Sequence, residues 1–490
     1  MAQRLQIAMV AGEAVPFAKV GGLADVLGAL PLHLEQLGAS VSVIIPRYRS
    51  IDIERFQFEA YPIPNLPPIF LGFESHPFDI HKGKLPGSNV DVYLIGNDHF
   101  FGRDGIYFDP ATGKDFPDQT DRWIFFQHAA MEFLRLTAPE VDIIHCHDHQ
   151  TGLIPAYVRR LYRPGGAFLQ TRVVFTIHNM GYQGLFAPEV MQRTGLNLAD
   201  FYPGSPFEFY GMLNFMKAGI SFADLVTTVS ETYAREIRES SEYGYGLEGV
   251  LADRGDELVG ILNGIDYEIW NPETDPLIPA HYSARSRKGK KDNRQALLQE
   301  FGLANRADWP VLAMISRIDA QKGFDLLVSI LDDLLAEDVY FVLLGSGNKE
   351  TEAALRAIVE RHPDRAALRF SYDNDLAHLI EAGADIFLMP SKYEPCGLNQ
   401  MYSMRYGTVP VVRATGGLAD TVLEFDPKSG LGTGFTFVNY DPVHFRGAID
   451  RALEFRKQPD VWRRIAVNGM TTDLSWTRSA ARYMEIYRRA

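Results

Sequence analysis

Cationic side chains recur in this sequence where an apolar segment gives way to a helical pattern. Arg317 and Lys322 lie five residues apart around one such turn. Arginine can bind phosphate oxygens through two parallel hydrogen bonds, and lysine adds a mobile point charge. The pair therefore predicts a site for a phosphorylated small molecule. A surface pair beside a turn is the plain alternative for either cation alone.

Two glycine turns could add backbone N–H groups to such a site. The loop Lys19-Val20-Gly21-Gly22 precedes one helical pattern, and Thr415-Gly416-Gly417 opens another. Glycine lets the backbone approach an oxygen-rich ligand, and a helix N-terminus favours negative charge. The alternatives are a tight turn with a solvated lysine and a helix capped by Thr415. A nicotinamide cofactor is not expected, because G-x-G-x-x-G is missing from the first loop and the second strand ends in Pro46-Arg47 rather than in an acid.

The segment 391–400 carries the most specific arrangement in the chain. Glu394 follows an expected strand, and Cys396, Gly397 and Leu398 begin a helix directly after it. A carboxylate beside converging backbone N–H groups can hold the hydroxyl groups of a sugar. The alternative is a solvated glutamate in a proline turn.

Two segments have the composition of metal sites, and we expect neither to bind a metal. The segment His145-Cys146-His147-Asp148-His149 would place three histidines on one face of a strand. Metal sites usually take a ligand from a distant segment, however, and no second cluster stands out. Asp373-Asn374-Asp375 matches the D-x-D pattern of metal-dependent sugar transferases, but Asp and Asn are ordinary caps between a strand and a helix.

Strands alternating with helices would position these residues. One series of apolar segments lies at 5–11, 41–45, 141–145, 173–177, 225–229 and 258–262, and a second at 311–315, 340–344, 368–372, 386–389 and 410–412. Continuous apolar strands of this kind form parallel sheets covered by helices on both faces. We therefore predict an α/β protein with two doubly wound, Rossmann-like domains, at 1–257 and 258–469, facing across a cleft. Ligands of such sheets bind beyond the carboxyl ends of the strands.

Composition narrows the class of protein. A chain of 490 residues exceeds one ordinary core, and its net charge of −14 argues against binding to nucleic acid. The basic run between Arg285 and Lys291 is expected to be a solvated surface segment. Two cysteines, no leader pattern and no run of about 18 apolar residues predict a cytoplasmic protein with no disulfide framework and no contact with a membrane.

Six motifs together resemble the family of bacterial glycogen synthases and plant starch synthases. They are Lys19-x-Gly-Gly-Leu23, Thr176-Ile-His-Asn179, Asn263-Gly264, Arg317-x4-Lys322-Gly323, Glu394-Pro-Cys-Gly-Leu398 and Thr415-Gly-Gly-Leu418. They occur in order along nearly the whole chain, and the segment 470–490 is similar to the final helix that returns to the first domain in the GT-B fold of that family. The resemblance implies a retaining transfer of glucose from ADP-glucose to the non-reducing end of an α-1,4-glucan, with no cofactor and no metal.

The resemblance also implies roles for individual residues. Arg317 and Lys322 would neutralise the departing diphosphate, Glu394 would orient the glucose hydroxyls, and His178 would hydrogen-bond the donor glucose. Tyr372 would stack on the adenine. The other donor contacts would come from Lys19, Gly21, Gly22, Asp25, Asn263, Cys396, Gly397, Leu398, Thr415, Gly416 and Gly417, and the acceptor side would include His147 and Asp148.

Three positions depart from related patterns, and alternatives remain open. His149 stands where tryptophan commonly follows His-Asp, Asn399 where threonine is frequent, and Tyr402 where many other retaining GT-B enzymes have a second glutamate. The nearest alternative is a retaining GT-B glycosyltransferase that uses another nucleotide sugar or a small acceptor. An α-glucan phosphorylase, which needs a pyridoxal cofactor, and a non-catalytic glucan-binding protein are more distant alternatives.

Overall fold

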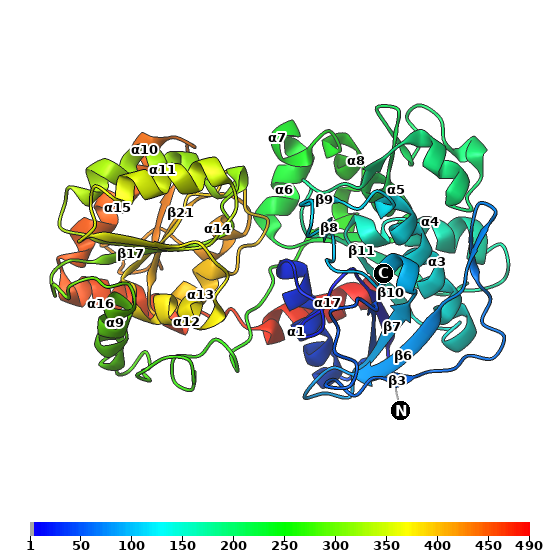
Figure 1. Cartoon of the computed structure of the whole chain (residues 1–490), viewed down its shortest axis with the longest axis horizontal. Helices are drawn as coiled ribbons and strands as arrows, with labels where there is room; N and C mark the ends of the chain where they lie inside the picture. The colour runs from blue at the N-terminus through cyan, green and yellow to red at the C-terminus, as the bar shows by residue number, and fades with distance from the viewer. Residues whose placement is uncertain (1–3) are drawn as a thin grey trace. The chain divides into compact units, whose positions relative to one another are not determined.

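Two units make up the computed structural model, which describes residues 4–490 (Figure 1). Unit 1 contains the chain up to Val229 together with Ala234–Ile261 and Trp476–Ala490. Unit 2 contains Ser230–Tyr233 and Leu262–Ser475. The main crossings between the units therefore lie after residues 261 and 475, whereas the predicted boundaries lie after residues 257 and 469.

Unit 1 is built on a nine-stranded sheet in the order β16-β15-β11-β10-β1-β2-β7-β6-β3. Its strands are parallel except where β6 pairs with β7 and β3 pairs with β6. Along the sheet the strand order reverses between β1 and β10, which is the place where doubly wound sheets bind their ligands. The strands are β1 (Gln6–Val10), β2 (Ser40–Pro46), β3 (Glu59–Ala60), β6 (Asp79–Lys84), β7 (Asp91–Gly96), β10 (Ile143–His147), β11 (Arg172–Ile177), β15 (Leu225–Thr228) and β16 (Leu258–Gly260).

Helices cover both faces of the unit 1 sheet. On one face α1 (Gly22–Gln36) packs against α17 (Trp476–Arg489), so the last helix of the chain lies beside the first (Figure 1). The other face carries α3 (Gln119–Thr137), α4 (Ile154–Tyr157) and α5 (Phe215–Phe222). The remaining α-helices are α2 (Asp98–Phe101), α6 (Glu231–Glu239), α7 (Ser241–Gly244) and α8 (Glu248–Ala252). The short strands outside the main sheet are β4 (Ile69–Leu71), β5 (Glu74–His76), β8 (Phe108–Asp109), β9 (Lys114–Asp115), β12 (Leu185–Phe186), β13 (Glu208–Phe209) and β14 (Met212–Asn214).

Unit 2 is built on a six-stranded, fully parallel sheet in the order β19-β18-β17-β20-β21-β22. Here the strand order reverses between β17 and β20. One buried cluster joins apolar side chains of the sheet, such as Leu312 and Phe341, to Leu327 and Phe445 of the covering helices. The strands are β17 (Val311–Ile315), β18 (Tyr340–Leu344), β19 (Ala366–Arg369), β20 (Ile386–Met389), β21 (Val409–Arg413) and β22 (Phe435–Phe437).

The helices of unit 2 also form two layers. In one layer α10 (Phe324–Leu335) contacts α11 (Lys349–Val359) and α15 (Pro442–Arg456), and in the other α12 (Asn374–Gly383) contacts α9 (Gly289–Glu300) and α13 (Asn399–Arg405) (Figure 1). The remaining α-helices are α14 (Gly416–Thr421) and α16 (Pro459–Thr471), and a 3-10 helix spans Ala320–Lys322. Among residues 4–490, no helix is both long enough and apolar enough to span a bilayer.

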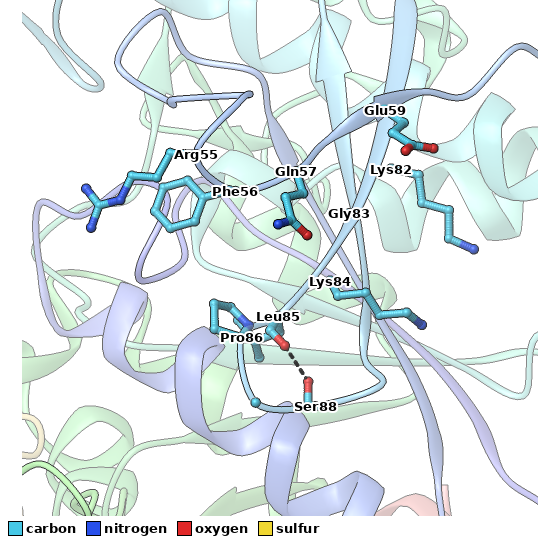
Figure 2. A pocket seen from close by; sticks show the side chains of 11 residues that line it. Arg55, Phe56, Gln57, Glu59, Lys82, Gly83, Lys84, Leu85, Pro86 and Ser88 are labelled. Carbon is cyan, nitrogen blue, oxygen red and sulfur yellow. Dashed lines mark hydrogen bonds between the residues drawn. The ribbon is translucent and has the colours of Figure 1, made fainter.

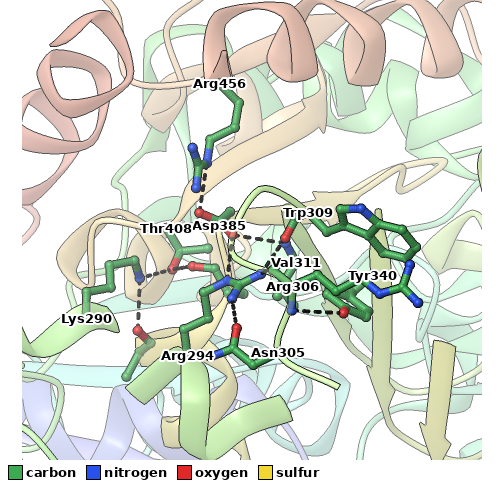
Figure 3. A network of polar contacts seen from close by, with 12 residues as sticks. Lys290, Arg294, Asn305, Arg306, Trp309, Val311, Tyr340, Asp385, Thr408 and Arg456 are labelled. Carbon is green, nitrogen blue, oxygen red and sulfur yellow. Dashed lines mark hydrogen bonds and ion pairs between the residues drawn. The ribbon is translucent and has the colours of Figure 1, made fainter. Parts of the chain in front are cut away.

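The prediction that the basic run is solvated is wrong for two of its members. Lys290 donates to Thr408 Oγ1 at 2.7 Å (Figure 3). It also donates to the carbonyl oxygens of Ala382 and Tyr406, at 3.1 Å each. Burial of its ammonium group lowers the pKa of Lys290 to about 7. Arg287 donates to the Gly407 carbonyl at 3.1 Å. The run therefore holds the start of α9 against residues 382 and 406–408 of the same unit. Peptide carbonyls there replace the water that the charges would otherwise bind.

Candidate active site

Three loops at the carboxyl ends of β17, β20 and β21 meet at one edge of the unit 2 sheet. They span residues 316–323, 390–398 and 414–418, and we call them the unit 2 loop cluster. Lys392 N–H donates to the Gln321 carbonyl at 2.7 Å, and Gly417 N–H donates to the Glu394 carbonyl at 3.1 Å. The predicted residues Arg317, Lys322, Glu394 and 415–417 therefore lie on loops that hydrogen-bond one another.

Close backbone contact explains the glycines of this cluster. Gly416 has a φ of +44°, and a Cβ atom there would lie 2.0 Å from the Glu394 carbonyl oxygen. Gly323 has a φ of +74°, and its Cβ would lie 2.0 Å from the Pro390 carbonyl oxygen. No side chain fits such distances, so both positions require glycine. The result is a densely packed edge at which backbone N–H groups and functional side chains are held in place.

Glu394 and Lys322 form an ion pair within the cluster. Lys322 Nζ lies 2.7 Å from Glu394 Oε2, and their side chains are only 18% and 8% exposed. Ser391 Oγ donates to the same carboxylate oxygen at 3.0 Å. These contacts hold the carboxylate in one orientation and the ammonium group beside it. The pair can therefore present a fixed acceptor and a fixed positive charge to a ligand.

Arg317 and Tyr372 are more exposed. The Arg317 side chain is 60% exposed, with Nη2 3.4 Å from Asp319 Oδ2. The third predicted strand of unit 2, at 368–372, ended at Tyr372, but β19 ends at Arg369, so Tyr372 lies in the following loop. Its side chain is accessible there, at 82% exposure. Both residues can therefore reach a ligand.

Cys396 and its neighbours complete the cluster. The thiol of Cys396 is buried and hydrogen-bonded to the backbone of Asn263, and burial raises its pKa to about 12. The group is thus a protonated thiol and not a nucleophile. Gln400 Nε2 donates to the Cys396 and Gly397 carbonyls at 3.0 Å each, which supports the turn before α13. Asn399 Nδ2 donates to the Ile315 carbonyl at 2.7 Å, joining this helix to the end of β17.

In unit 1 the loop after β1 is held by a carboxylate that was not among the predicted site residues. Glu13 is buried and accepts the N–H groups of Val20 and Gly21, the latter at 3.1 Å. Burial raises its pKa to about 7, although these two N–H groups and Tyr107 act in the opposite direction. The Gly21 amide is thus engaged by the protein itself. An acidic residue inside the apolar stretch 7–18 is the signal that could have revealed it.

Lys19 and Asp25 pair with each other across the start of α1. Lys19 Nζ lies 2.7 Å from Asp25 Oδ1, and the side chains are 43% and 26% exposed. Burial raises the pKa of Asp25, and the neighbouring Lys19 opposes that shift. The contact fixes the lysine over the helix N-terminus, as expected if Asp25 orders this loop.

His178 lies just beyond β11 and is anchored by Asp148. Its backbone N–H donates to Asp148 Oδ1 at 2.7 Å. Asp148 has φ +56° and ψ −176°, a conformation that costs a non-glycine residue of order 1–3 kcal/mol. Burial raises the pKa of Asp148 to about 7, while the N–H groups of His178 and Asn179 lower it. This strained aspartate therefore fixes the loop that carries His178.

His147 is completely buried, and its Nδ1 lies 3.0 Å from His178 Nε2. This burial argues against direct contact between His147 and an acceptor, the role implied by the resemblance. The strand β10 reaches residue 147, two residues beyond the predicted strand, and the shift places His147 next to β11.

Comparison with known proteins agrees with this layout. Residues 6–253 match the family described as starch synthase catalytic domain, and residues 298–468 match glycosyl transferases group 1. The chain is 45% identical to a glycogen synthase of Thermotoga maritima over 490 residues, which cover 99% of both chains. The chain belongs to the glycogen and starch synthase family. A glycogen synthase of Koribacter versatilis is likewise 45% identical, with 99% of this chain and 98% of that protein covered.

Solved structures place this synthase family member in the GT-B fold. The catalytic domain of starch synthase IV from Arabidopsis thaliana, bound to ADP and acarbose, matches with a TM-score of 0.90 and 34% identity over 99% of each chain. A sucrose-phosphate synthase from Thermosynechococcus elongatus matches over 99% of each chain with a TM-score of 0.61 and 18% identity, and so shares the fold alone. The expected pair of Rossmann-like GT-B domains is confirmed.

Two further observations concern metal binding and a hollow on the surface of unit 1. Within residues 4–490, no group of three or more His, Cys, Asp and Glu side chains is arranged to hold a metal ion. A metal-free reaction stays a prediction. A surface hollow of about 440 Å³ lies near Phe56 and is lined in part by Lys82 and Lys84, which both pair with Asp91. Figure 2 shows the side chains that line it. None of the predicted site residues lines this hollow.

Proposed function

We propose that this chain transfers glucose from ADP-glucose to the non-reducing end of an α-1,4-glucan, with retention of the anomeric configuration. The observation that carries the proposal is the unit 2 loop cluster, which holds Lys322, Arg317 and Glu394 at one sheet edge beside the N-terminus of α14. Glycogen synthases at 45% identity and a starch synthase structure with bound ADP support the choice of donor and acceptor.

The roles of the site residues follow from the charges that develop when the donor is cleaved. Cleavage of the bond between glucose and diphosphate leaves negative charge on the diphosphate and positive character on the sugar ring. Arg317, Lys322 and the N–H groups at the start of α14 stabilise the departing diphosphate. Glu394, held by Lys322 and Ser391, orients the glucose hydroxyls, and we assign it to orientation rather than to attack on the sugar. Donor contacts of Lys19, Asp25, His178, Asn263 and Tyr372 stay predictions, as does a cytoplasmic location.

Incorporation of labelled glucose into glycogen tests the proposal. The protein is supplied with ADP-glucose or with UDP-glucose, with glycogen or with maltose as acceptor. We expect incorporation into glycogen from ADP-glucose to exceed that from UDP-glucose. Faster turnover with UDP-glucose, or transfer to the small acceptor alone, would instead establish a GT-B glycosyltransferase of different specificity. Pyridoxal absorbance in the purified protein would indicate a phosphorylase.

A further inference from the structure

A chain of aromatic side chains runs through unit 1 from the last helix to His178. Tyr487 of α17 lies with its hydroxyl 2.8 Å from His145 Nδ1, and His145 Nε2 lies 2.6 Å from Thr176 Oγ1. The rings of His145 and His147 are 4.1 Å apart, and His147 Nδ1 lies 3.0 Å from His178 Nε2. We call Tyr487, His145, His147 and His178 the histidine chain.

The histidines of this chain are neutral at neutral pH. Burial lowers the pKa of His145 and of His178 to about 3, and it lowers the pKa of His147 as well. The carboxylate of Asp148 accepts a hydrogen bond from the backbone N–H of His178. Each ring therefore carries one proton, and the hydrogen bond between His147 and His178 admits two arrangements.

The environment of His147 selects one of them. His147 Nε2 is buried and has no hydrogen-bond partner among the described residues. A proton on Nε2 would leave a buried N–H without an acceptor, which is rarer in proteins than an unused lone pair. The proton therefore sits on His147 Nδ1, which donates to His178 Nε2. His178 must then carry its own proton on Nδ1.

We propose that His147 is a positioning residue that holds His178 as the Nδ1–H tautomer, so that this partly exposed ring offers an N–H to an oxygen atom of the donor sugar. The proposal rests on the proposed function for the identity of that sugar. The opposite tautomer would present a bare Nδ1, which can only accept a hydrogen bond. His147 thus decides whether His178 acts as a donor or as an acceptor.

Nitrogen-15 NMR of histidine side chains tests the tautomer directly, because protonated and bare ring nitrogens differ widely in chemical shift. The full chain is labelled with 15N-histidine, and the His178 signals are assigned by comparison with His178→Gln. We expect a protonated Nδ1 and a bare Nε2 in the unsubstituted protein. A protonated Nε2 on His178 would overturn the proposal. This measurement needs no substrate, so its outcome is separate from that of the glucose-incorporation assay.

Substitutions at position 147 test the consequence. His147→Phe keeps an aromatic ring but has no donor, whereas His147→Asn keeps an N–H near the position of Nδ1. We expect His147→Phe to lower kcat by about 10–10²-fold, typical of losing the partner that orients a functional histidine, and His147→Asn to restore most of it. His178 in His147→Phe should show a mixture of tautomers.

The matched control is His128→Phe. His128 is a histidine of the same unit whose Nε2 lies 2.8 Å from the Thr194 carbonyl oxygen. We expect this variant to keep the His178 tautomer and the kcat, even if it lowers the melting temperature. Equal kcat in His147→Phe and the unsubstituted protein would contradict the proposal. If His147→Phe does not fold, the tautomer of the unsubstituted protein and the kcat of His147→Asn decide.

Discussion

The contribution of the Lys322 ammonium group to turnover can be measured separately from its contribution to folding. Its ammonium group lies 2.7 Å from Glu394 at the unit 2 loop cluster. Loss of one preorganised group that stabilises developing charge typically costs about 2.7–4 kcal/mol of transition-state stabilisation, so we expect Lys322→Ala to lower kcat by about 10²–10³-fold. The assay is glucose incorporation from ADP-glucose, with circular dichroism to verify folding.

Lys349→Ala serves as the control for Lys322→Ala. Lys349 pairs with Glu352 on the surface of α11, with 81% of its side chain exposed. Glu352 is itself only 9% exposed and keeps the Gly347 N–H as a partner, so we expect this variant to retain full turnover. Unchanged turnover in Lys322→Ala would remove that lysine from the site.

Glu13 makes the stability of unit 1 depend on pH. Burial raises its pKa from 4.5 to about 7, so the folded chain binds this proton more tightly than the unfolded chain does. The unfolding free energy should therefore decrease as pH rises from about 4.5 to 7, with a limit of about 3 kcal/mol for a shift of this size. Urea unfolding at pH 5, 6, 7 and 8 measures it.

Glu13→Gln isolates the contribution of that carboxylate. Glutamine cannot titrate, whereas Asp148, whose pKa is also raised to about 7, is present in both proteins and cancels. The stability of the unsubstituted protein minus that of Glu13→Gln should fall from pH 5 to pH 8. A difference that stays constant or rises over this range would show that Glu13 is already ionised at pH 5.

At the scale of elements, the site depends on loops packed backbone against backbone. Gly416→Ala would force a Cβ atom against the Glu394 carbonyl and hold alanine at a positive φ. We expect a loss of several kcal/mol of stability or displacement of the loop with loss of turnover. Gly447→Ala in α15 is the control, because its Cβ meets nothing within 4 Å and alanine favours helix by up to about 1 kcal/mol. Unfolding in denaturant compares the two, and a Gly416→Ala protein as stable and active as Gly447→Ala would refute this account of the glycine.

The sequence predicted the elements better than the contacts between them. Arg317, Lys322 and Glu394 could be placed because each follows a recognisable apolar strand, and strand ends share an edge in parallel sheets. The pairing of His147 with His178 could not, because it depends on which strands are neighbours and in what register. An acid inside an apolar stretch indicates a buried carboxylate at Glu13, but its partners are backbone N–H groups seven and eight residues away, and no side-chain pattern identifies those. Lys290 was misplaced because a run of charges says nothing about the carbonyls that surround one of them.

At the scale of the whole molecule, unit 1 is discontinuous in sequence. Its last helix, α17, comes after the whole of unit 2 and buries Trp476, Tyr483, Ile486 and Tyr487. These side chains pack beside α1, the helix that follows the Lys19 loop. A fragment that ends near residue 261 therefore lacks part of its own core. The fragment is continuous in sequence, but it lacks α17.

We expect the fragment 1–261 to be unstable by itself and to be rescued by a peptide of residues 470–490. The fragment exposes the apolar face of α1 that α17 covers and leaves His145 without the Tyr487 hydroxyl. It should bind the dye ANS and melt without a cooperative transition, and the peptide should restore cooperativity. A peptide with Tyr483→Ala and Tyr487→Ala should fail to do so, because both rings are buried in the intact unit. A fragment that unfolds cooperatively without any peptide, at the same temperature as with it, would show that α17 is dispensable. Unit 1 would then owe its stability to the nine-stranded sheet and the other helices alone.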